Sequence, residues 1–258
     1  TTPNGLSYQI GPDTFSEVNH QVELQQFQQK QTWLQQQQQQ ELSSNNGPPS
    51  ILLCTGRDIS SLALGFGSTR DTANDNPLFH HVIAMQHCPL VHRDALMNFA
   101  RHDHLSIAVF HRDKTNMVKT LSGELAKYDD RPIVGIMTGG RKGLDPAYLE
   151  YLVGNQNIRC IIYNSCSTKS LLRDMNGFVH GGFCIDDFWS YDLFPNTSYT
   201  ASLTKLRRRP RTLVIPVGPA GVGKSTMSQI LVQQMPALWW QRDAVFCRFR
   251  DAGMGLNK

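Results

Sequence analysis

A glycine-rich run near residue 220 carries the residue types that bind phosphate. Residues 218–226 read Gly-Pro-Ala-Gly-Val-Gly-Lys-Ser-Thr and match the phosphate-loop pattern G-x-x-x-x-G-K-[ST]. Glycines let successive backbone N–H groups converge on a phosphate, lysine neutralises its oxygens, and serine can ligate Mg²⁺. The pattern predicts ATP or GTP with magnesium; the alternative is a glycine-rich turn without a ligand. The candidate residues are Gly218, Gly221, Val222, Gly223, Lys224, Ser225 as the magnesium ligand, and Thr226.

A basic cluster precedes this loop. Five cations occur within seven residues, namely Lys205, Arg207, Arg208, Arg209 and Arg211. Such a cluster suits RNA phosphates, and a solvated linker is the alternative interpretation. The chain as a whole is only mildly basic, with a formal net charge of +4.

Composition limits the class of protein. The 258 residues, 40% of them hydrophobic, are enough for one large or two small globular domains. The six cysteines form no C-x-x-C pair, which argues against a disulfide framework or a zinc site. We therefore expect a reducing intracellular compartment, with the mitochondrial matrix, cytoplasm and nucleus left open. No apolar run is long enough to predict a membrane span.

Strands and helices that would position these residues alternate along the chain. This alternation predicts an α/β fold with a mostly parallel, doubly wound sheet that binds ligands at the carboxyl ends of its strands. Expected strands are 51–54, 81–85, 106–110, 133–137, 160–163, 183–189 and 201–206. Expected helices are 60–65, 90–101, 117–127, 145–154 and 167–176. The phosphate loop lies between a strand-like run at 212–217 and a helix at 225–234.

Three segments are expected. Residues 1–49 form an N-terminal helix, starting near Val18, that frays into a glutamine-rich polar linker. Residues 50–208 form a Rossmann-like domain. Residues 209–258 form an incomplete P-loop segment, because two strands cannot enclose a nucleotide.

A family resemblance rests on the stretch around Cys166. Residues 161–168, Ile-Ile-Tyr-Asn-Ser-Cys-Ser-Thr, with Leu-Leu-Arg-Asp at 171–174, resemble the V-Y-x-S-C-N-P-x-T-L-x-R-D stretch of RNA uracil-5-methyltransferases. Further ordered similarities, covering roughly residues 6–208, occur at 8–10, 14–19, 94–98, 141–144 and 192–197. The resemblance implies an S-adenosylmethionine-dependent methyltransferase fold that binds RNA. It places Cys166 on the nucleophile, whose thiolate adds to C6 of uracil; the alternative is a buried, inert cysteine.

The chain departs from the family where the chemistry takes place. The cofactor loop D-L-x-C-G-x-G reads Leu-Leu-Cys-Thr-Gly-Arg-Asp at 52–58, and the D-P-P-R loop reads Thr-Gly-Gly-Arg at 138–141. Glu17 replaces a glutamine, and Gln86 stands where the family has the acid that grips the cofactor ribose. Ala201 stands near the position of the glutamate that removes the C5 proton. These departures predict a degenerate methyltransferase, a pseudoenzyme that does not use S-adenosylmethionine.

The tail resembles the start of polynucleotide 5′-kinase domains. Arg-Asp at 242–243 follows the phosphate loop, and in such kinases the aspartate deprotonates the attacking 5′-hydroxyl. Asp243 is therefore a candidate kinase base, or alternatively a helix N-cap.

Three functions follow from these patterns. The leading hypothesis is a non-catalytic subunit that binds RNA or ribonucleoprotein and other proteins, for example in ribosome assembly. It combines a degenerate methyltransferase fold with an ATP-binding P-loop. The alternatives are an ATP-dependent polynucleotide 5′-kinase and an active tRNA or rRNA uracil-5-methyltransferase.

Overall fold

The structure is a computed structural model. It describes residues 5–12, 19–45, 50–56, 59–70, 76–111, 114–192, 197, 200–209, 217, 219 and 221–234. The chain divides into two compact units, Thr1–Arg209 and Pro210–Lys258, which are described separately. The division into three segments predicted from the sequence is not tested by this and stays a prediction.

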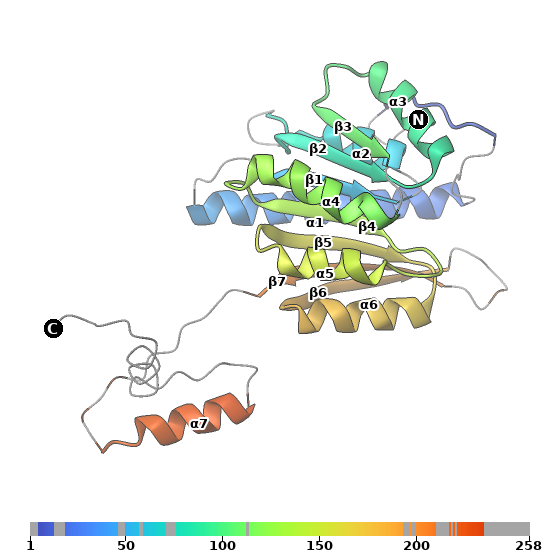
Figure 1. Ribbon diagram of the computed structural model, residues 1–258. Helices are drawn as coiled ribbons and strands as arrows, with labels where there is room; N and C mark the ends of the chain where they lie inside the picture. The colour runs from blue at the N-terminus through green and yellow to red at the C-terminus, as the bar shows by residue number, and fades with distance from the viewer. Residues whose placement is uncertain are drawn as a thin grey trace. The chain divides into compact units, whose positions relative to one another are not determined.

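A seven-stranded sheet forms the centre of the first unit, in the order β3-β2-β1-β4-β5-β7-β6 (Figure 1). Strands β1 to β5 are parallel, and β7 runs antiparallel to both β5 and β6. The mostly parallel α/β sheet predicted from the alternating pattern is confirmed. Its strands are β1 Ile51–Thr55, β2 His81–Gln86, β3 Ile107–His111, β4 Ile133–Thr138, β5 Ile158–Ser165, β6 Phe183–Tyr191 and β7 Ala201–Arg208.

Helices cover both faces of this sheet because successive side chains of a strand point to opposite sides. On β1, Leu52 and Cys54 join one buried cluster, whereas Ile51 and Leu53 join the other. The first cluster lies under α1 (His20–Asn45), α2 (Ile59–Gly67) and α3 (Pro89–Ala100). The second lies under α4 (Lys114–Leu125), α5 (Pro146–Gly154) and α6 (Thr168–His180), with η1 (Ala126–Tyr128) after α4 (Figure 1).

Helix α1 differs from the sequence expectation. The glutamine-rich stretch was expected to fray into a polar linker, but the helix continues to Asn45, and residues 46–49 lie outside the described part of the chain. Three of its glutamines, Gln26, Gln37 and Gln38, are buried. Gln38 accepts a hydrogen bond from Ser50 Oγ at 3.1 Å. Gln26 Oε1 likewise accepts from Asn164 Nδ2 on β5 at 3.2 Å, so two of these buried amides have polar partners on or next to the sheet, whereas the buried Oε1 of Gln37 accepts no hydrogen bond from the described residues.

Aromatic packing fixes α1 on the sheet. The rings of Phe27 on α1 and Phe66 on α2 stack with their centroids 4.3 Å apart. Phe27 also lies over Gly65, where an added Cβ would meet its ring at 2.5 Å. Only a glycine leaves room for this contact, so the α1–α2 interface depends on the ring and the glycine together.

The second unit is described only at residues 217, 219 and 221–234. It contains helix α7 (Lys224–Gln234), close to the helix expected at 225–234. The strand expected at 212–217 lies outside the described residues apart from Val217, so a P-loop unit is not shown. Among the helices that the structure describes, none has the length and apolar character needed to cross a bilayer.

Candidate functional site

The carboxyl ends of the parallel strands meet at one edge of the sheet, as they do wherever parallel strands lie in register. Thr55, Gln86 and Thr138 end β1, β2 and β4, and Cys166 follows β5 directly. Gly56 comes next after β1 with a φ of 147°, a conformation that favours glycine. The edge therefore combines a glycine turn, polar side chains and a thiol.

The side chain of Gln86 closes the turns after β1 and β2. Its Nε2 donates to the carbonyl oxygen of Gly56, and its Oε1 accepts from the backbone N–H groups of His87 at 2.7 Å and Cys88 at 2.9 Å. Gln86 is only 3% exposed. Its amide is thus bonded to the backbone of both turns. A carboxylate there could accept from the same two N–H groups but could not donate to Gly56.

Cys166 lies where β5 leads into α6 and is partly buried. It is not part of a disulfide. Hydroxyls hold the residues on either side: Ser165 Oγ donates to Ser167 O at 3.2 Å, and Ser170 Oγ donates to the same oxygen at 3.1 Å. The loop that carries the thiol is fixed, while the thiol keeps some access to solvent.

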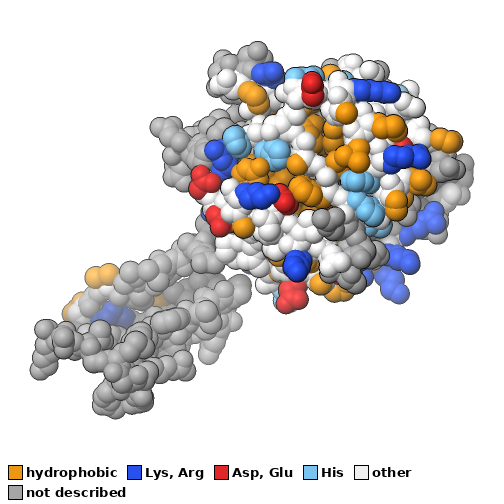
Figure 2. All heavy atoms as spheres, turned by 45° about the horizontal axis from the view of Figure 1, so that its top comes forward, with side chains coloured by type: hydrophobic (Ala, Val, Ile, Leu, Met, Phe, Trp, Pro, Cys, Tyr) orange, Lys and Arg blue, Asp and Glu red, His pale blue; other side chains and the backbone are white. Residues whose placement is uncertain are grey.

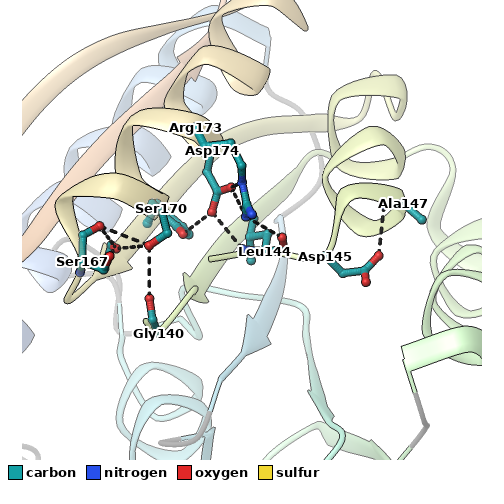
Figure 3. A network of polar contacts seen from close by, with 10 residues as sticks. Gly140, Leu144, Asp145, Ala147, Ser167, Ser170, Arg173 and Asp174 are labelled. Atoms are coloured by element: carbon teal, nitrogen blue, oxygen red, sulfur yellow. Dashed lines mark hydrogen bonds and ion pairs between the residues drawn. The ribbon is translucent and has the colours of Figure 1, made fainter. Parts of the chain in front are cut away.

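A buried carboxylate joins this region to the loop after β4 (Figure 3). Asp174 on α6 has no solvent exposure. Its Oδ2 accepts from Tyr163 Oη at 2.5 Å and from Leu144 N at 2.8 Å, and Arg173 Nη2 donates to its Oδ1 at 2.6 Å. Burial first, and then the bond to Asp174, raise the pKa of Tyr163, which stays a neutral donor.

Two glycines let the loop after β4 approach this network. A Cβ on Gly143 (φ +73°) would lie 2.5 Å from Asp174 Oδ2. A Cβ on Gly139 would collide with the Tyr163 hydroxyl, and Gly139 N donates to Asn164 O at 2.9 Å. The Thr-Gly-Gly-Arg loop at 138–141 is therefore packed tightly beside the segment that carries Cys166.

Ala201, near the expected position of the proton-removing glutamate, begins β7. It is 1% exposed and pairs with Tyr191. A methyl group in the core has no proton-transfer chemistry to offer at this edge.

The basic cluster is divided by its contacts within the protein. Lys205 is 4% exposed and pairs with Asp186 at 3.1 Å. Arg207 pairs with the same carboxylate at 3.2 Å, but its side chain remains 42% exposed. Arg208 donates to main-chain carbonyls, including Ile158 O at 2.7 Å. Arg209 is exposed. The expected RNA contact stays a prediction, and of the described residues Arg207 and Arg209 are the ones whose exposed side chains could make it. Arg211 lies outside the described residues.

The two cations that pair with Asp186 change its pKa. Burial acts to raise the pKa of Asp186, but the hydrogen bonds and charges of Lys205 and Arg207 outweigh it and lower the pKa overall. Asp186 is therefore held in its ionised form between two cations.

In the second unit, the predicted phosphate loop is described in part. Gly221 and Gly223 have φ angles of 82° and 86°, and the Nζ of Lys224 donates to Pro219 O at 2.5 Å. Ser225 and Thr226 are exposed in the first turn of α7, and Val222 is exposed before it. Gly218 and Asp243 lie outside the described residues. Within the described residues, no group of three or more His, Cys, Asp or Glu side chains could hold a metal ion.

Sequence comparison finds relatives that are RNA methyltransferases by name. The chain is 30% identical over 98 residues to an uncharacterized RNA methyltransferase of Clostridium tetani, covering 36% of this chain and 21% of that protein. It is 32% identical over 80 residues to one of Gloeobacter violaceus, covering 31% of this chain and 17% of that protein. The chain thus spans about a fifth of the length of these relatives. No protein-family model matches it.

Solved structures identify the fold. The methyltransferase domain of METTL16 matches with a TM-score of 0.53 at 12% identity, over 79% of this chain and 74% of that one. The N-terminal domain of human METTL16 in complex with SAH, S-adenosylhomocysteine, matches with a TM-score of 0.51 at 12% identity, over 79% and 76%. The chain has a Rossmann-like methyltransferase fold. The relatives and the fold agree on this class, whereas specificity for uracil C5 stays a prediction.

This finding corrects the cofactor prediction. The sequence predicted that ATP or GTP binds with magnesium at the phosphate loop and that S-adenosylmethionine is not used. The prediction against S-adenosylmethionine is contradicted, because the fold is that of methyltransferases and a structure that shares it was solved with SAH. The comparisons give no support for ATP or GTP at the phosphate loop. Single replacements in the cofactor loop weighed too heavily in that prediction, because a glycine turn at the end of β1 is retained at Gly56.

Proposed function

We propose that this chain binds S-adenosylmethionine and RNA at the carboxyl edge of its sheet without methylating uracil C5. The observation that carries the proposal is Ala201, a buried methyl group near the position at which the resemblance requires a base. Relatives named as RNA methyltransferases support RNA as the partner. The glycine turn after β1 supports the cofactor site, since a residue without a side chain allows a ligand to approach the backbone closely.

The experiment measures cofactor and RNA separately. Binding of S-adenosylhomocysteine is titrated by calorimetry on the full chain, and binding of single-stranded RNA by fluorescence anisotropy. Methyl transfer is followed with radiolabelled S-adenosylmethionine and uridine-containing RNA. We expect binding in both titrations and no labelled 5-methyluridine. Absence of saturable S-adenosylhomocysteine binding would overturn the proposed cofactor binding. Absence of RNA binding would overturn the proposed RNA binding.

Gln86 offers a sharper test of where the cofactor lies. The variant Gln86→Glu keeps an acceptor for the N–H groups of His87 and Cys88, loses the hydrogen bond to Gly56 O, and adds a charge that can accept ribose hydroxyls. We expect it to bind S-adenosylhomocysteine about 5- to 10-fold more tightly, since one charge-assisted hydrogen bond is worth ~1.5–3 kcal/mol before desolvation. Gln86→Met, which has similar size but no polar atoms, is the control and should weaken binding. Equal affinities for all three proteins would place the cofactor elsewhere.

A second candidate is methyl transfer that uses Cys166. The position of this partly exposed residue directly after β5, beside the loop at 138–141, favours it. The thiolate would add to C6 of a pyrimidine, and C5 would then take the methyl group of S-adenosylmethionine, which would leave as S-adenosylhomocysteine. Loss of the C5 proton to a group other than Ala201 would expel the thiolate and restore the ring. A denaturation-resistant adduct with 5-fluorouridine RNA, lost in Cys166→Ser, would establish this chemistry; its absence at saturating RNA and S-adenosylmethionine would exclude it.

A further inference from the structure

Strand β6 exposes large apolar side chains at the end of the sheet. Within the described residues no strand pairs with its outer edge, because β6 is the last strand in the order. Ile185, Phe188 and Trp189 are 51%, 50% and 45% exposed. An edge strand that exposes large apolar side chains is a candidate surface for contact with a ligand or a partner.

Trp189 lies close to a second aromatic ring on the same strand. Its ring lies 6.3 Å from that of Tyr191 with 23° between the two planes, and Tyr191 is itself 8% exposed. Next to them, Trp33 Nε1 on α1 donates to Asp187 Oδ2 at 3.1 Å and ties the strand to the helix layer. The indole therefore has an aromatic neighbour on its own strand and remains 45% exposed to solvent.

The sheet register places this surface beside the candidate site. Trp189 pairs with Leu203 on β7, and Leu203 pairs with Asn164 on β5. Asn164 lies two residues before Cys166 and accepts Gly139 N from the loop after β4. Trp189 therefore lies in the same cross-strand row as the residues that border the carboxyl edge, two strands away from β5.

Charge on the β6–β7 ribbon complements an anion. Across residues 183–191 and 201–209, four cations stand against two carboxylates. Asp186 takes both Lys205 and Arg207, and the side chain of Arg207 stays 42% exposed. The face in Figure 2 carries hydrophobic side chains at its centre, with lysines and arginines around them. The ribbon thus carries the exposed indole of Trp189 together with the exposed cations Arg207 and Arg209.

We propose that Trp189 stacks on an unpaired base of a single-stranded RNA that runs along the β6–β7 ribbon toward the carboxyl edge. The inference rests on the proposed function, because it takes RNA as the partner. Every base has an aromatic face, so stacking on an indole binds single strands with little sequence preference and excludes duplexes, whose bases are already stacked. Arg207 and Arg209 would contact the phosphates.

The test compares variants of the full chain for binding to a labelled single-stranded RNA of roughly 12 nucleotides, a length within the usual site size. The variants are Trp189→Ala, Trp189→Phe and Ile185→Ala. Stacking is worth ~1–3 kcal/mol per base, so Trp189→Ala should weaken binding about 5- to 150-fold. Trp189→Phe should recover most of the loss, and Ile185→Ala, which removes an equally exposed apolar side chain, should bind like the wild type. Circular dichroism and thermal unfolding establish that the variants are folded.

The possible results separate a failure of RNA binding from a failure of the stacking site. If the wild type binds no RNA, the RNA part of the proposed function falls, and this inference falls with it. If the wild type binds RNA and Trp189→Ala binds equally well, only the stacking site is overturned. Two further results would instead make β6 an edge that pairs with another protein chain. One is an equal loss of RNA affinity in Trp189→Ala and Ile185→Ala. The other is a concentration-dependent dimerisation that both variants abolish.

Discussion

Asp174 shows how one residue sets the shape of the candidate site. Its fully buried carboxylate accepts from Tyr163 on β5 and from the backbone of Leu144 after β4, while Arg173 on the same helix neutralises it. One side chain therefore joins β5, which leads to Cys166, to the loop after β4. Removing a buried acceptor costs the desolvation free energy of each donor left behind.

Asp174→Ala should lower the free energy of unfolding by about 2–6 kcal/mol, because two buried donors lose their acceptor at ~1–3 kcal/mol each. Urea unfolding followed by far-UV circular dichroism measures this. The control is Asp145→Ala in the same loop, whose exposed carboxylate caps α5 through Ala147 N at 3.0 Å and should cost only ~1 kcal/mol. Equal losses for the two variants would show that the network does not act as described.

At the residue scale, the sequence predicted where the site residues lie better than it predicted which groups their side chains contact. Cys166 and Gln86 both lie at the carboxyl edge, as strand–helix alternation requires. Lys205 and Arg208, in contrast, were grouped with RNA-binding cations, yet their partners are Asp186 and main-chain carbonyls. Those partners are distant in the sequence, and no local pattern reveals them. Trp189 was passed over for the same reason, since its exposure depends on which strand lies at the edge.

At the scale of elements, hydrophobic patterning was sufficient. All seven strands and all five helices expected between residues 51 and 206 are present, with ends that differ by a few residues. Helix α1 is the exception, because buried glutamines defeat a rule based on polarity. Hydrophobic patterning also does not predict which groups bond the carbonyl oxygens at the ends of helices. Arg208, at the end of β7, donates to Leu152 O at 3.2 Å and Asn155 O at 2.9 Å, where α5 ends.

Arg208→Met should therefore destabilise the first unit by about 2–4 kcal/mol, since several helix-end carbonyls lose a charged donor and the favourable dipole contact. Methionine keeps the apolar stem that packs near the Phe183 ring, over which the guanidinium carbon lies at 4.2 Å. Arg209→Met is the matched control. Its side chain is exposed, and the change should stay within ~0.5 kcal/mol. A loss in Arg208→Met no larger than in the control would mean that solvent satisfies these carbonyls equally well.

At the scale of the whole molecule, the order of the strands determines which parts of the chain can stand alone. The pattern predicted a parallel sheet but not the insertion of β7 between β5 and β6, because strand order depends on long-range pairing. All seven strands lie in Thr1–Arg209. That unit also has buried clusters on both faces of its sheet.

A chain that ends at Arg209 should therefore unfold cooperatively, with a midpoint in urea within experimental error of the transition that the full chain shows for its sheet unit. A second truncation that ends at Thr200 is the control. It removes β7, which pairs with both β5 and β6, and so leaves β6 without a neighbour and the backbone edge of β5 open. This shorter chain should lose cooperative unfolding and expose apolar surface that binds a hydrophobic dye. If the chain ending at Arg209 also loses its transition, residues 210–258 contribute to the stability of the sheet, and the two compact units fold as one.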